Sequence, residues 1–134
     1  MDAPLAGGHL LAAISTAIVA ILREHYGRGP MQAKTFVVDD IVMVVMRGIG
    51  FTALEQTIMD DSTGGDSGDR VVLMRHDFQR MIGKRYAGKI EELTGRRVLA
   101  FLSQAHVDPD LTVEIFFLDT PLQGFAAPEI AGPA

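Results

Sequence analysis

The stretch "ELTGRRVLAFLSQAHVDPDLTVEIFF" (residues 92–117) decides the fold, because it contains a helix end, two strands and the turn between them. Gly95 follows a helical pattern and can adopt the positive φ that ends a helix. Two runs rich in β-branched and aromatic residues, 98–103 and 111–118, flank the sequence "HVDPD", whose Asp and Pro residues are typical of turns. The stretch therefore predicts a helix followed by a strand pair.

A second stretch, "HYGRGPMQAKTFVVDDIVMVVM" (residues 25–46), repeats this order of features. A helix predicted over 10–26 ends at "GRGP", because glycine accepts positive φ and proline cannot continue a helix. Strands predicted over 34–38 and 41–46 flank a two-residue Asp-Asp turn. The two α-β-β units predict an α+β fold, in which a mainly antiparallel four-stranded sheet has helices on one face.

Two further helices are predicted between these units. Thr52 and Glu55 have the spacing of a capping box, which satisfies backbone N–H groups at the start of a short helix. Residues 62–68, rich in small and acidic side chains, are expected to form an exposed loop. A longer helix over 71–94 has apolar residues at the spacing of one buried face. These residues are Met74, Phe78, Ile82, Tyr86, Ile90 and Leu93.

The composition is that of one acidic domain. The 134 residues suffice for a single domain, predicted over 1–118, and the Pro/Ala-rich residues 119–134 are expected to form a flexible tail. A formal net charge of −5 argues against binding to nucleic acid, which needs clustered Lys and Arg. The absence of cysteine excludes disulfides, Cys-based zinc sites and a thiol nucleophile, and it fits a cytoplasmic protein.

Residues 3–22 contain no charged side chain and approach the length of a membrane span, about 20 residues. Gly7, Gly8 and His9 interrupt the segment, and Asp2 stands where a secretory signal would have basic residues. Apolar residues recur through the rest at helical spacing. We therefore expect a buried amphipathic helix and no membrane insertion.

The predicted strands are apolar on both faces. One alternating set in the last strand can face the helices: Leu111, Val113, Ile115 and Phe117. The other set still includes Phe116 and Leu118, and residues 41–46 have no polar side chain at all. A sheet with one face in water would alternate more regularly. Because hydrophobic residues make up 48% of the chain, we predict a homodimer that covers the spare sheet face.

His106, Asp108 and Asp110 carry groups that suit a metal or acid–base site, and alternate residues of an extended strand share one face. Asp39 or Asp40 would add a ligand if the two turns adjoin. The proline between the two later aspartates interrupts an extended arrangement and favours a turn. The preferred interpretation is structural turns at both places, with no catalytic residue, no metal and no cofactor. A polar site at these residues is the alternative.

Arg28, Arg96 and Arg97 follow the predicted ends of the two long helices. Positive charge is favourable at a helix C-terminus, and this is the simpler interpretation. The alternative is a small-anion site, formed if the two helix ends are neighbours.

Taken together, "GRGP", "AKTFVVDDIVMVVM" and "EELTGRRVLAFLSQAHVDPDLTVEIFFL" resemble the MpsC family over residues 14–118. The run from "LTGRRV" to "HVDPD" is the most specific part. The resemblance implies association with a cation-translocating, membrane-potential-generating system. It also implies a membrane partner subunit similar to proton-pumping antiporter-like proteins, and it assigns no role to any individual residue.

Two functions are therefore in competition. The favoured one is a soluble, non-catalytic accessory or regulatory component of a membrane system that handles cations or bicarbonate. Such a protein would be cytoplasmic and would reach the membrane through its partner. The alternative is a stand-alone dimeric module that binds a small anion at the three arginines.

Overall fold

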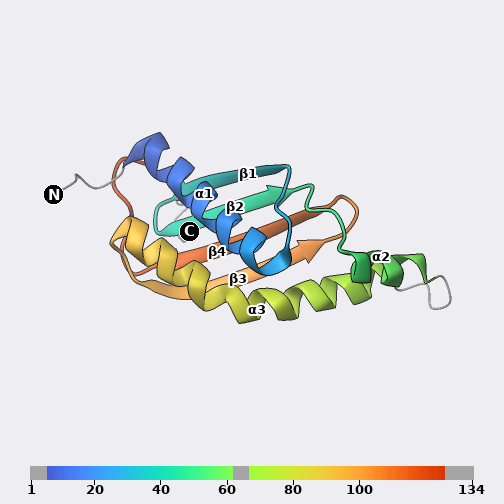
Figure 1. Ribbon diagram of the computed structural model, residues 1–134. Helices are drawn as coiled ribbons and strands as arrows, with labels where there is room; N and C mark the ends of the chain where they lie inside the picture. Colours follow the sequence, from blue (N-terminus) through green and yellow to red (C-terminus); the bar gives the residue numbers. More distant parts are fainter. Residues whose placement is uncertain (1–5, 62–66, 126–134) are drawn as a thin grey trace, which may run out of the picture.

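The computed structural model describes residues 6–61 and 67–125, and its elements follow the predicted α-β-β-α-α-β-β order (Figure 1). The described elements are α1 (Gly7–Tyr26), β1 (Gln32–Val38), β2 (Ile41–Arg47), α2 (Ala53–Asp60), α3 (Ser67–Thr94), β3 (Val98–His106) and β4 (Leu111–Leu118). The strands form one antiparallel sheet in the order β1-β2-β4-β3. The predicted fold class is confirmed.

The helix ends form as the local sequence predicts. Gly27 has φ 83° and donates its N–H to the Arg23 carbonyl at 3.0 Å, and Gly95 has φ 70° and donates to the Glu91 carbonyl at 2.9 Å. Both are left-handed C-terminal caps that glycine adopts without strain. At the start of α2, Thr52 and Glu55 form both halves of the capping box.

Both long helices lie on the same face of the sheet and run antiparallel to each other (Figure 1). On α1, the buried row consists of Leu10, Ile14, Ile18, Ile21 and Leu22. This helix is long and apolar enough to span a membrane by length and composition alone. In the structure, however, its row of Leu and Ile packs into the core with side chains of the sheet and of α3.

The helix α3 lies close to the sheet at Gly83. A Cβ atom built at this position would lie 2.8 Å from the Phe101 ring, so only glycine fits without a shift of the aromatic side chain. Phe101 itself packs between Tyr86 and Phe116, with ring centroids 6.2 Å and 5.1 Å away. This aromatic contact joins α3, β3 and β4.

Two predicted boundaries differ from the structure. The helix α3 begins at Ser67, so the end of the predicted loop is helical, while residues 62–66 lie outside the described residues. After β4, Leu122 is buried in the core and its N–H donates to the Asp39 carbonyl at 3.2 Å. The fold therefore extends past the predicted start of the tail, whose residues 126–134 lie outside the described part.

The predicted orientation of β4 was wrong. The side chains buried beneath the helices are Thr112, Glu114, Phe116 and Leu118. The set expected there, which contains Leu111, Val113, Ile115 and Phe117, is only partly buried and lies on the opposite face. The register explains this orientation, because cross-strand partners share a face and β4 pairs this set with the buried Val42, Val44 and Met46 of β2. The more apolar face of β4 is thus left without a helix.

We call the sheet face away from the helices the open face. Its apolar side chains are Phe36, Val38, Ile41, Met43, Val45, Leu102, Leu111, Val113, Ile115 and Phe117. The register places Phe36, Met43, Ile115 and Leu102 in one row across all four strands. No helix among the described residues covers this face (Figure 1). A second apolar face is present, as the strand sequences lead us to expect, but β4 contributes to it the set that was expected beneath the helices.

Candidate functional site

Ionisable side chains from four parts of the chain converge at one end of the sheet, and we call them the Arg75 cluster. It consists of Tyr26 from α1, Glu55 from α2, Arg75 from α3 and Asp110 from the turn before β4. The α3 spacing that buries Val71 and Gln79 also brings Arg75 to the inner face, where only 4% of it is exposed. A buried charge needs partners, and the cluster supplies them.

Arg75 binds Glu55 in a bidentate manner, with Nε 3.0 Å from Oε2 and Nη2 3.1 Å from Oε1. Its Nη2 also donates to the Gly50 carbonyl, and its Nη1 lies 3.5 Å from Asp110 Oδ1. Asp110 Oδ2 in turn accepts the Gly50 N–H at 2.7 Å. The guanidinium thereby ties α2 and the loop after β2 to α3 and the β3–β4 turn.

The cluster fixes the charge state of Glu55. Burial alone would raise the pKa of this carboxyl, but hydrogen bonds from Arg75, Tyr26 and Thr52 hold the pKa below its ordinary value. Burial raises the pKa of Tyr26, and its hydrogen bond to Glu55 raises it further, so the phenol stays protonated. With these donors and acceptors already paired, the cluster is built to hold the structure together.

A second buried group, Glu114, lacks such partners. It is fully buried on β4, and neither carboxyl oxygen has a hydrogen-bond partner among the described residues. The Tyr86 hydroxyl and the Thr112 hydroxyl, also buried, are likewise unpaired within the described part of the chain. Ser103, directly across from Glu114 on β3, donates to Gln79 instead.

Burial raises the pKa of Glu114 to about 8, and the nearby Ser103 hydroxyl opposes part of the rise. Burial also raises the pKa of Tyr86, which the neighbouring Glu114 raises further. An isolated ionised carboxylate is costly in an apolar interior, so the carboxyl is held in its neutral form near neutral pH. Glu114 is therefore a buried proton-binding group in the centre of the domain.

The three residues of the "HVDPD" turn do not converge on a common point. Residues 107–110 form the turn between β3 and β4, in which His106 Nδ1 lies 2.9 Å from the Pro109 carbonyl oxygen. Asp110 is directed to Gly50 and Arg75, whereas Asp108 is exposed. No group of three or more His, Asp or Glu residues in the described ranges could hold a metal ion. The expectation that the protein binds no metal stays a prediction.

Asp39 and Asp40 form the two-residue turn between β1 and β2, where Asp39 has φ 56°. The register pairs Ile41 with Phe117 and Arg47 with Leu111, so this turn lies at the opposite end of the sheet from His106. The idea that Asp39 or Asp40 adds a ligand to the later turn was therefore wrong. Their carbonyl oxygens instead accept the N–H groups of Leu122 and Leu118.

The three-arginine anion site was also wrong. Because α1 and α3 are antiparallel, their C-terminal ends lie at opposite ends of the domain (Figure 1). Arg28 Nη1 donates to the Phe51 carbonyl at 2.6 Å, near α2. Arg96 lies beside the N-terminal part of α1, and the Arg97 N–H donates to Asp119 at 3.2 Å. No single anion can contact all three side chains.

Comparison with known proteins identifies the family. A family model described as "Na+-translocating membrane potential-generating system (MpsC)" matches residues 7–120. The chain belongs to the MpsC family. No curated protein and no solved structure matches it. The match spans all the described helices and strands of this MpsC chain, including the Arg75 cluster, Glu114 and the open face.

Sequence reasoning missed the residues that are most distinctive in this MpsC chain. Arg75 and Gln79 fall on the same helical row as Val71, Ile82 and Tyr86, and this position was the available signal. Glu114 belongs to the strand set that also contains Phe116 and Leu118, which were noted as a second apolar side. In each case the polar residue occupies a position that the apolar pattern of its helix or strand marks as buried.

Proposed function

We propose that the chain is a non-catalytic accessory component of a membrane cation-translocating, membrane-potential-generating system. The observation that carries the proposal is the family match over residues 7–120. The structure is compatible with a binding role, because the Arg75 cluster is fully engaged in internal contacts and the open face is apolar. The protein would act on the cytoplasmic side and reach the membrane through a partner subunit.

We further propose that the working form is a homodimer joined through the open face. Strands lie about 4.8 Å apart and rise about 3.3 Å per residue, so this face covers roughly 440 Å² in projection. A standard stable interface buries about 800 Å² per partner, so the open face would form the central part of such an interface. The charged side chains Lys34 and Arg47 lie on the edge strand β1 and at the end of β2, so the apolar centre of this face can pair with itself about a two-fold axis.

Replacing Met43 and Ile115 together by glutamate is expected to convert the dimer into a monomer. The two side chains are paired neighbours on β2 and β4 in the centre of the open face. Burying four like charges between two copies would abolish association. Sedimentation velocity at about 100 µM protein, well above a micromolar Kd, measures the change.

The matched control is Leu54→Glu with Leu73→Glu, which adds the same charge at two exposed positions on α2 and α3. This variant should remain dimeric. A wild-type chain that sediments as a monomer at the same concentration would contradict the proposed dimer. So would a dimer that survives both open-face substitutions.

Deleting the gene from its native host is expected to lower the membrane potential, or to slow growth that is limited by ion or bicarbonate supply. A potential-sensitive dye measures the first effect, and a plasmid copy of the wild-type gene should reverse it. A tagged chain should copurify with an integral membrane subunit from detergent extracts. Unchanged potential and growth, together with the absence of any membrane subunit, would refute the accessory function.

The alternative function, a stand-alone module that binds a small anion, is disfavoured because the three arginines that would form its site are far apart. Turnover of a small molecule by the purified protein would contradict both functions and would point to an enzyme.

A further inference from the structure

An unpaired strand edge borders the sheet beside α3. The strand β3 is last in the order β1-β2-β4-β3, so the outer row of its backbone N–H and C=O groups pairs with no described strand. Two apolar side chains of this strand, Leu99 and Leu102, are 64% and 55% exposed. Proteins usually protect such an edge, since it is a template for pairing with another chain.

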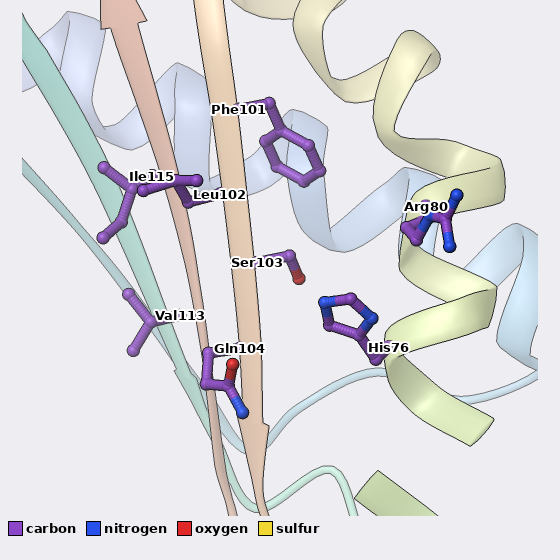
Figure 2. Close-up of a pocket in the computed structure, with 8 residues that line it drawn as sticks. All are labelled: His76, Arg80, Phe101, Leu102, Ser103, Gln104, Val113 and Ile115. Atoms are coloured by element: carbon purple, nitrogen blue, oxygen red, sulfur yellow. The ribbon is translucent and has the colours of Figure 1, made fainter. Parts of the chain in front are cut away.

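A groove follows this edge. Two adjoining cavities of about 500 Å³ and 350 Å³ share Arg80 and Phe101. Figure 2 shows His76 and Arg80 of α3 on one side of the first cavity, with Phe101 and Ser103 directed toward them from β3. On the far side of the same strand, Leu102, Val113 and Ile115 line the cavity from the open face (Figure 2). The groove thus reaches both faces of the sheet edge.

The helix side of the groove is basic. His76, Arg80 and Lys84 are four residues apart on α3 and line the two cavities, and none of them forms a hydrogen bond or ion pair with another described residue. Asp77 is on the same helix but lines neither cavity. Successive members of this row are about 6 Å apart along the helix. Side chains on one face of an extended strand recur at nearly the same interval, about 6.6 Å.

We propose that this groove binds an extended acidic segment of a partner protein as a fifth strand beside β3. The backbone of the segment would pair with the free edge of β3. Its alternate side chains would be acidic toward the basic row of α3 and apolar toward Leu102, which lies on the edge strand at the margin of the open face. Main-chain pairing supplies affinity in this mode of recognition, and the alternate side chains supply specificity.

Three other occupants fit less well. A second copy paired through β3 would bring no acidic residue, since this strand has none, and would place two basic rows near each other. Nucleic acid is disfavoured by the net charge of −5. A lipid headgroup surface is flat and cannot pair with the backbone of a strand edge. The inference goes beyond the proposed function, because it holds whether or not the partner belongs to a membrane system.

The test is fluorescence anisotropy of the full chain with a labelled peptide of alternating glutamate and valine, about eight residues long. The same peptide with lysine in place of glutamate serves as the charge control. We expect the acidic peptide to bind and the lysine peptide not to bind. In the variant Arg80→Glu with Lys84→Glu, affinity for the acidic peptide should fall by at least about tenfold.

The matched variant is Arg85→Glu with Lys89→Glu, which changes the net charge equally on the side of α3 that faces α1. It should change affinity by less than about twofold. Hydrogen exchange should show peptide-dependent protection of the β3 amides. The proposal is overturned if the acidic peptide does not bind, if both double variants lose affinity equally, or if protection falls outside β3. It is also overturned if anionic phospholipid vesicles or a single-stranded oligonucleotide bind through Arg80 and Lys84 while the peptide does not.

Discussion

Replacing Arg75 with methionine is expected to lower the free energy of unfolding by about 3–5 kcal/mol. The methionine fills much of the same space but leaves Glu55, which is 2% exposed, without its bidentate partner. Removing one partner of a buried ion pair is costly because the remaining charge stays out of water. Since domains of this size have roughly 5–15 kcal/mol of stability in total, the loss is a large share of it.

Urea denaturation at pH 7 and a fixed protein concentration measures this effect. The matched control is Arg70→Met, also on α3, which removes an exposed ion pair with Asp61 at the end of α2 and should cost less than about 1 kcal/mol. A loss at Arg75 no larger than the loss at Arg70 would show that the cluster is not a structural tie.

The cost of Arg75→Met should also depend on pH. In the wild type the pKa of Glu55 is held low, so its contribution to stability is present above the unfolded-state value near 4.5 and is lost as the pH falls through the folded-state pKa. Without Arg75, the pKa of this carboxyl should rise and its protonation should relieve the unpaired charge. The difference between variant and wild type should therefore shrink in acid.

Replacing Glu114 with glutamine is expected to stabilise the protein at alkaline pH. The folded-state pKa of Glu114 is raised from 4.5 to about 8, so the folded protein binds this proton more tightly than the unfolded chain does. The resulting stability is fully present below about pH 4.5 and is lost as the pH rises through about 8. Glutamine has nearly the same shape and cannot ionise, so the stability of the variant does not fall as the pH rises through this range.

The expected difference is small at pH 5 and grows to as much as about 4 kcal/mol in favour of the variant at pH 9. Urea midpoints across this range, at one protein concentration, measure it. Glu92→Gln, at a side chain that is 68% exposed, should retain the pH dependence of the wild type. If Glu114→Gln follows the same pH curve as Glu92→Gln, then Glu114 is not the buried proton-binding group described above.

Local features of the fold could be predicted because neighbouring residues determine them. Gly27 and Gly95 end their helices through backbone freedom that other residues lack, and Thr52 with Glu55 caps α2 by reciprocal hydrogen bonds. The Asp39-Asp40 turn joins its strands for a similarly local reason. Each of these depends on residues within one turn of chain, so no knowledge of the tertiary structure was needed.

The features that failed depend on partners far away in sequence. Glu55 had a correct local role as a cap, yet its second role depends on Arg75, which lies on another helix. The anion site of Arg28, Arg96 and Arg97 failed because the direction of α3 relative to α1 is not encoded at either helix end. The face of β4 was misjudged because hydrophobicity alone ranked the open-face set above the set containing Glu114. The long-range register with β2 instead places the Glu114 set beside the buried Val42, Val44 and Met46.

The central position of the β2–β4 pair has a consequence for how the chain folds. The pairs β1–β2 and β3–β4 are hairpins whose strands are close in sequence, but β2 and β4 join residues on the order of 70 positions apart. Each hairpin can form early, whereas the sheet is complete only after a long segment containing α2 and α3 has closed. The slow step should therefore be the meeting of two preformed halves, and until it occurs the inner edges of both hairpins are exposed to pairing with other chains.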